Sequence, residues 1–158
     1  DKEYMTTNYL PMKDYLEPGC YINYFYGSPW SEHGSGCFSP AIITAANNFL
    51  HDNNSNLTAQ SLSYSSVNTL FNELTKGHPV IVWTCFNYDA EVSYIDIDIG
   101  NGQTFSWPTN EHCTVLTGFD LTTSTVTLAD PTYGIIERSI EEFSYYYKIY
   151  FYQAVVIK

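Results

Sequence analysis

Residues 79–86 read Pro-Val-Ile-Val-Trp-Thr-Cys-Phe, an almost unbroken apolar run with several β-branched side chains. Such a run predicts a strand that is covered on both of its faces. A strand of this kind lies in the interior of a sheet. The rest of the chain must therefore supply neighbouring strands and the helices that cover them.

Two helices are predicted ahead of this strand. Pro40 stands at a first helical position and apolar residues follow at helical spacing, which predicts a helix from about Ser39 to His51. Ser65-Ser66 caps a second helix, and Gly77 ends it. The apolar stripe of the second helix is expected to face the sheet; it consists of Val67, Leu70, Phe71 and Leu74.

Strand patterns dominate the second half of the chain. They cover residues 92–99, 103–107, 112–119, 125–130, 135–138 and 154–157. Ser139-Ile140-Glu141-Glu142 fits a capping box, which predicts a short helix through Tyr147. Residues 1–36 show no sustained period and are expected to form a short helix or turn followed by a long loop. Helices followed by a mostly antiparallel sheet predict one α+β domain over residues 1–158.

The charge of the chain excludes several classes of partner. Six Lys and Arg against 17 Asp and Glu give a net charge of -11, so a phosphate backbone or an anionic membrane surface is repelled and no nucleic acid is expected. No apolar run approaches the ~20 residues that cross a bilayer. The chain has no CxxC pair and no histidines at metal-ligand spacing, so neither a metal nor another cofactor is expected.

The four cysteines are Cys20, Cys37, Cys85 and Cys113. They are too few and too irregularly spaced for a small disulfide scaffold. Cys20 and Cys37 both stand in Gly-rich, loop-like sequence, so a disulfide between them is one interpretation. Four free thiols are the other.

His112 opens one predicted strand and Asp130 closes the next. A tight loop around residues 121–124 brings both residues to the same end of a hairpin. Because successive side chains alternate between faces, a loop of odd length puts them on one face and an even loop turns them apart. On spacing alone, ordinary turn and cap roles for both residues stay open.

The letters around these residues carry more information than their spacing. The stretches concerned are LTKGHPVIVW at 74–83, NEHCTVLTGFD at 110–120, LADP at 128–131, Phe143, QAVVI at 153–157 and SGCFSPA at 35–41. Their order and spacing resemble the bacteriocin-leader-peptidase-like branch of the papain-like cysteine peptidases. The resemblance implies that fold, a peptide or protein substrate, His112 as general base and Asp130 as the carboxylate that orients it. Thr114 and Pro131 are expected to be structural.

The resemblance also implies a nucleophilic Cys and an oxyanion-binding Gln on a helix that would precede Asp1, so the chain is expected to start inside the domain. Cys37 is the alternative nucleophile, since it follows Gly36 and precedes a helix whose dipole lowers a thiol pKa. The same comparison places Gly36-Cys37-Phe38 at the second helix of the family. Cys113 is expected on the face of its strand opposite His112, and Cys85 inside a buried strand.

The leading interpretation is a cysteine peptidase that uses thiolate attack with the His112 and Asp130 pair. The alternative is a catalytically inactive domain of the same fold that binds peptides, and a third interpretation is an acyl transferase. The resemblance implies an exported or surface-associated protein of a Gram-positive bacterium. His33, His51 and His78 are expected in turns or at a helix end, and Trp30 and Trp107 are candidates to line a cleft.

Overall fold

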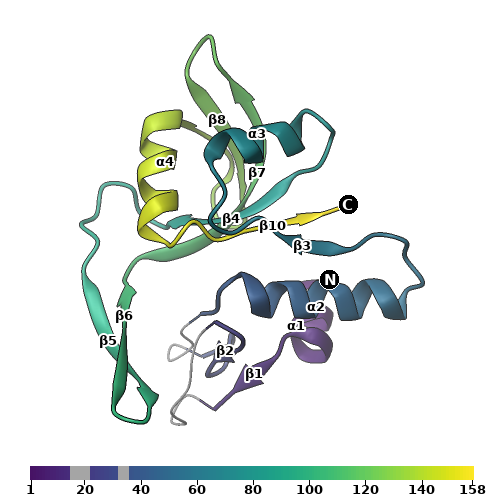
Figure 1. The fold of residues 1–158 in the computed structure, drawn as a ribbon, viewed down its shortest axis with the longest axis vertical. Coiled ribbons are helices and arrows are strands. Elements are labelled where there is room, and N and C mark those ends of the chain that lie inside the picture. Colours follow the sequence, from purple (N-terminus) through teal and green to yellow (C-terminus); the bar gives the residue numbers. More distant parts are fainter. Residues whose placement is uncertain (15–21, 32–35) are drawn as a thin grey trace. The chain divides into compact units, whose positions relative to one another are not determined.

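The computed structural model describes residues 1–14, 22–31 and 36–158. The chain divides into two compact units, each with its own helices and strands (Figure 1). The N-terminal unit comprises residues 1–61 and 95–107, and the sheet unit comprises residues 62–94 and 108–158. A single domain over the whole chain stays a prediction.

The N-terminal unit contains the helix that was predicted at residues 39–51. Its elements are α1 (Lys2–Tyr9), β1 (Met12–Lys13), β2 (Phe25–Tyr26), α2 (Ser39–Asp52), β3 (Ala59–Ser61) and most of a hairpin formed by β5 (Tyr94–Gly100) and β6 (Gln103–Pro108). Pro40 lies in the first turn of α2, and the ring of Tyr9 packs edge-on against Phe49 at 5.6 Å. The helix prediction is confirmed.

Strands β1 and β2 pair in parallel and were not predicted. Each has two residues, and so short a strand shows no alternation of apolar and polar side chains. The expected short helix near the start of the chain is α1, in which the Asp1 side chain accepts hydrogen bonds from the first turn.

The sheet unit is built on five neighbouring strands in the order β10-β4-β7-β8-β9, with each pair antiparallel. Its elements are α3 (Val67–Leu74), β4 (Val80–Cys85), β7 (Glu111–Asp120), β8 (Thr125–Asp130), β9 (Gly134–Ser139), α4 (Ile140–Ile149) and β10 (Ala154–Ile157). Strand β4 has a neighbour on each side, as its apolar run predicted. The α+β fold class is confirmed.

Helix α3 covers the sheet in the predicted way. The Ser66 side chain accepts a hydrogen bond from the amide of Thr69, and Gly77 turns the chain at a φ of 83° that favours glycine. Leu70 and Phe71 are buried in one cluster with side chains of β4, β7, β8 and α4. Burial of each such side chain stabilises the fold by roughly 1.5–3 kcal/mol.

The hairpin of β7 and β8 contains a β-bulge that sets its register. Leu116 pairs with Leu128 and Gly118 with Thr127, so Thr117 is an extra residue in β7. The connecting loop, residues 121–124, has an even length. An even loop was expected to turn His112 and Asp130 apart, but the bulge at Thr117 takes up one residue of β7 and restores their common face.

None of the described helices is long and apolar enough to cross a membrane.

Candidate active site

His112 and Asp130 meet inside the sheet unit. His112 is near the start of β7 and Asp130 is the last residue of β8, and the bulge at Thr117 puts their side chains on one face. Nε2 of His112 lies 2.8 Å from Oδ2 of Asp130. The histidine side chain is 14% exposed and the aspartate side chain 3%. The prediction that the two side chains meet is confirmed.

Asp130 is held by the turn that follows it. Its Oδ1 accepts hydrogen bonds from the amides of Thr132 at 2.7 Å and Tyr133 at 3.0 Å, while Oδ2 faces His112. Burial acts to raise the pKa of Asp130, but the two amides and the imidazole outweigh it, so that the pKa is lowered. Asp130 is therefore a fixed carboxylate at neutral pH.

The carboxylate selects one tautomer of the imidazole. A carboxylate only accepts hydrogen bonds, so Nε2 of His112 carries the proton and donates it to Asp130. Nδ1 then carries the lone pair, and within the described residues it has no hydrogen-bond partner. This arrangement can take a proton at Nδ1 and stabilise the resulting imidazolium through Asp130.

Two exposed aromatic side chains adjoin the pair. The ring of Phe86 packs edge-on against His112 at 5.1 Å, and Tyr133 lies 5.4 Å from Phe86. Phe86 is 41% exposed and Tyr133 55% exposed. Sequence reasoning did not select Phe86, although the register could have indicated it, because Thr84 pairs with His112 and Phe86 follows two residues later.

The cysteines of the sheet unit are poorly placed to be the nucleophile that gives its proton to His112. Burial raises the pKa of the Cys85 thiol to about 12. Cys113 follows His112 directly in β7, so its side chain points to the other face. Both predictions for these two cysteines are confirmed.

Cys37 belongs to the N-terminal unit. It is 7% exposed and precedes Phe38, the N-cap residue of α2, as predicted from the sequence. Cys20 lies outside the described residues, so the two interpretations, a disulfide with Cys37 or free thiols, are both untested.

The other described histidines and the two tryptophans that were considered from the sequence differ in their contacts and in their exposure. His51 contacts Asp52 at 3.2 Å, and His78 contacts the buried carboxylate of Glu73 at 2.9 Å. His33 lies outside the described residues. Trp107 is 5% exposed and stacks on Phe38 at 4.5 Å, so it packs inside the N-terminal unit, whereas Trp30 is 58% exposed.

Thr114 is buried, as expected for a structural residue. It follows His112 on the same face of β7 and is 2% exposed. Its Oγ1 makes no hydrogen bond within the described part of the chain.

Comparisons with known proteins bear on the fold and the family of the chain. No curated protein sequence matches the chain. A solved structure of a C39-like peptidase from Bacillus anthracis superposes with a TM-score of 0.84 at 22% sequence identity, over 100% of this chain and 79% of the other. The family model of the peptidase C39-like family matches residues 2–155. Because that match spans nearly the whole sequence, the chain belongs to the peptidase C39-like family.

Proposed function

We propose that this protein is a cysteine peptidase in which His112 is the general base and Asp130 orients it. The observation that carries the proposal is the 2.8 Å hydrogen bond from Nε2 to Oδ2, which leaves Nδ1 open to a thiol. Membership of the peptidase C39-like family supports peptide bonds as the substrate class.

The chemistry follows from the tautomer. Nδ1 of His112 takes the proton of a cysteine thiol, and the thiolate attacks the carbonyl carbon of the peptide bond. As the tetrahedral intermediate collapses, the imidazolium returns the proton to the leaving amine and a thioester remains. Water then attacks the thioester with His112 again as base, which releases the acid and restores the thiol.

The nucleophile in this proposal is a cysteine outside the sheet unit. Cys37 is the candidate within the chain, because a residue just ahead of a helix gains from the helix dipole, which favours a thiolate. Mass mapping after brief iodoacetamide treatment tests Cys37, since an activated thiol is alkylated first.

The second candidate function is peptide binding without catalysis. It is favoured by one observation: neither Cys85, with its raised pKa, nor Cys113, on the opposite face of β7, can give a proton to His112. A chain that keeps the fold but has no cysteine at Nδ1 would bind peptides and not cleave them.

Cleavage of a quenched fluorescent peptide library by the protein and by His112→Ala and Asp130→Ala variants tests the two candidates. For a peptidase, loss of the base lowers the rate by about 100-fold to 10,000-fold. Absence of cleavage by the unmodified protein, together with uniformly slow alkylation of its cysteines, would favour the binding function.

We further propose that the protein acts outside the cytoplasm of a Gram-positive bacterium. The composition supports this, since 15 Tyr accompany only six Lys and Arg. Immunodetection in culture medium and cell-wall fractions, with a cytoplasmic marker as control, tests the location. Detection in the cytoplasmic fraction alone would contradict it.

A further inference from the structure

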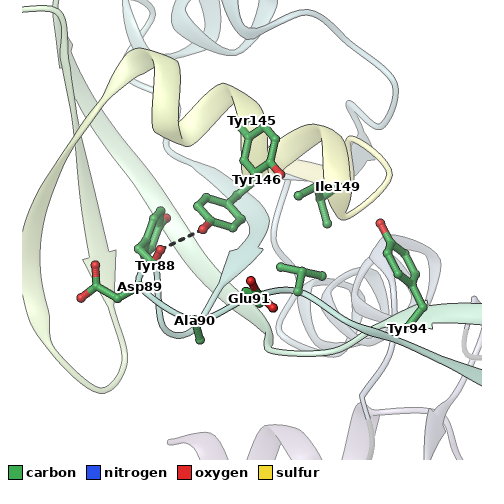
Figure 2. Close-up of a pocket in the computed structure, with 9 residues that line it drawn as sticks. Tyr88, Asp89, Ala90, Glu91, Tyr94, Tyr145, Tyr146 and Ile149 are labelled. Carbon is green, nitrogen blue, oxygen red and sulfur yellow. Dashed lines mark hydrogen bonds between the residues drawn. The ribbon is translucent and has the colours of Figure 1, made fainter.

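A recess lies within the sheet unit, between the segment that follows β4 and helix α4. Its volume is about 510 Å³, which is within the range of small-ligand sites. Figure 2 shows the segment of Tyr88, Asp89, Ala90 and Glu91 passing below α4, with Tyr146 directed from the helix toward it. The recess has no role in the proton transfer proposed for His112.

Four of the nine residues that line the recess are tyrosines. The ring-bearing residues are Tyr88, Tyr94, Tyr145 and Tyr146. Tyr146 donates a hydrogen bond to the carbonyl oxygen of Tyr88 at 2.8 Å and its ring meets the Tyr88 ring edge-on at 4.9 Å, so the wall joins two separate elements. Burial raises the pKa of Tyr88 to about 12, so this hydroxyl is neutral at physiological pH.

The charged residues of the recess are both acidic. Asp89 and Glu91 line it, and no Lys or Arg is among the described residues that do so. A wall of aromatic faces with carboxylates beside it attracts cations, through the ring quadrupoles and through direct ion pairing.

Tyr88 already binds a guanidinium in this way. The guanidinium carbon of Arg138 lies 4.4 Å from the centre of the Tyr88 ring. Arg138 carries one positive charge, whereas Asp89 and Glu91 together carry two negative charges. The recess and its neighbour Arg138 therefore have a net negative charge.

The recess is tied to the candidate active site through the sheet. The Tyr88 hydroxyl lies 2.6 Å from Oγ1 of Thr84, and Thr84 is the residue of β4 that pairs with His112. The recess and His112 are therefore connected through one hydrogen bond and one pair of neighbouring strands.

From these contacts we propose that the recess binds a basic side chain of a peptide substrate, with arginine preferred to lysine. The proposal rests on the proposed peptide substrate but not on its cleavage. Arginine is preferred because its planar guanidinium stacks on aromatic rings and pairs with two carboxylate oxygens at once, whereas the lysine ammonium is a strongly hydrated point charge.

Peptide binding to the His112→Ala variant tests the proposal without turnover. The probes are a short acetylated, amidated alanine peptide with one central Arg and the same peptide with citrulline, which has nearly the same shape and no charge. Nitrogen–proton NMR follows the amides of Ala90, Val92 and Tyr145 during titration. We expect the Arg peptide to shift these amides and to bind about 10-fold or more tightly than the citrulline peptide.

Substitutions locate the effect. Glu91→Gln in the same background is expected to weaken the Arg peptide about 2-fold to 5-fold and to leave the citrulline peptide unchanged. Glu137→Gln removes an exposed carboxylate of β9 outside the recess and is expected to change neither affinity. Because the Arg and citrulline comparison needs no substitution in the recess, it stands even if a variant folds poorly.

The outcomes separate this proposal from the proposed function. Equal affinity for both peptides, or shifts confined to amides away from the recess, would overturn the basic-side-chain site whether or not the protein cleaves peptides. Arg-dependent shifts that Glu91→Gln weakens would support the site even if no peptide bond is ever hydrolysed.

Discussion

Asp130 uses its two carboxylate oxygens for different partners. Oδ1 accepts from the amides of Thr132 and Tyr133, and Oδ2 accepts from His112. A carboxamide has one accepting oxygen, so it cannot serve the turn and the imidazole together. The identity of this residue as Asp therefore matters more than its polarity.

We predict that Asp130→Asn impairs catalysis nearly as much as Asp130→Ala. In the variant the amide oxygen keeps the turn while the NH₂ group faces Nε2, which favours the tautomer with its proton on Nδ1. The base is then lost, with an expected fall in peptide cleavage of about 1,000-fold or more. Kinetics of the two variants, with thermal unfolding as a control for folding, measure this. A carboxamide variant that retains a tenth or more of the activity would refute the argument.

We predict that the carboxyl group of Glu111 makes the unfolding free energy of the protein depend on pH. Burial raises its pKa to about 8 from an ordinary value of 4.5, so the folded state keeps a proton that the unfolded state loses in this window. The folded state is therefore favoured fully below the lower value and loses stability as pH rises toward the upper one, by ~1.4 kcal/mol for each pH unit.

Glu111→Gln is predicted to remove this loss. Relative to the unmodified protein, the variant should gain about 2–3 kcal/mol of unfolding free energy between about pH 5.5 and about pH 7.5. Urea unfolding at both pH values measures it, with Glu137→Gln as a matched exposed carboxylate. Parallel pH profiles for the Glu111 variant and the unmodified protein would show that this carboxyl group is not responsible.

At the scale of elements, the bulge in β7 takes up the one residue that would otherwise turn His112 and Asp130 to opposite faces. Without Thr117, Leu116 and Gly118 would be adjacent residues opposite Leu128 and Thr127, which is a regular antiparallel ladder. The strand pairing that positions His112 therefore does not require Thr117.

Deletion of Thr117 is predicted to be tolerated, with a change in unfolding free energy of about 1 kcal/mol. Deletion of Val115 shortens the chain by the same one residue. It forces either Leu116 out of the core or His112 to the other face of the sheet. The first alternative alone costs about 2–4 kcal/mol. Chemical unfolding of both deletions tests the register, and equal damage from both would contradict it.

The elements that the sequence predicts well are those whose ends have a local cause. Ser66 caps α3, Gly77 ends it and Pro40 begins α2, and each boundary lies within a few residues of the expected position. The bulge at Thr117 was not predicted, because an extra strand residue leaves no change in composition. The bulge is the reason that His112 and Asp130 share a face although their connecting loop has the even length that was expected to turn them apart.

Polar contacts between residues far apart in the sequence were also not predicted. Glu73 is buried at the end of α3 and contacts Lys76 at 2.8 Å, His78 at 2.9 Å and Lys158 at 3.5 Å. Lys158 is far away in sequence, so no periodicity reveals this cluster, and His78 alone indicated only a turn. The pair of His112 and Asp130 was predicted from the family resemblance of the residues around it, and the spacing of the two strand ends showed only that a contact was possible.

At the scale of the whole molecule, the net charge of -11 affects which peptides arrive at the site. An acidic protein attracts basic peptides, and dissolved salt weakens this attraction. The Debye length, over which charges act on one another, shortens from about 10 Å at 0.1 M salt to about 3 Å at 1 M. We predict that raising salt over this range weakens the Arg peptide about 3-fold or more and leaves the citrulline peptide unchanged. Calorimetric titration measures both affinities, and equal salt dependence would count against electrostatic selection.

The tautomer of His112 is the most direct test of the central claim, that one carboxylate leaves Nδ1 ready to take a proton. Two-dimensional nitrogen–proton NMR of the imidazole rings at neutral pH shows which ring nitrogen carries the proton. The His112 signal is assigned as the one that is missing from the spectrum of a His112→Ala variant. The expected result is a proton on Nε2, a bare Nδ1 and loss of this pattern in Asp130→Ala. A proton on Nδ1, or a spectrum that Asp130→Ala leaves unchanged, would contradict the claim.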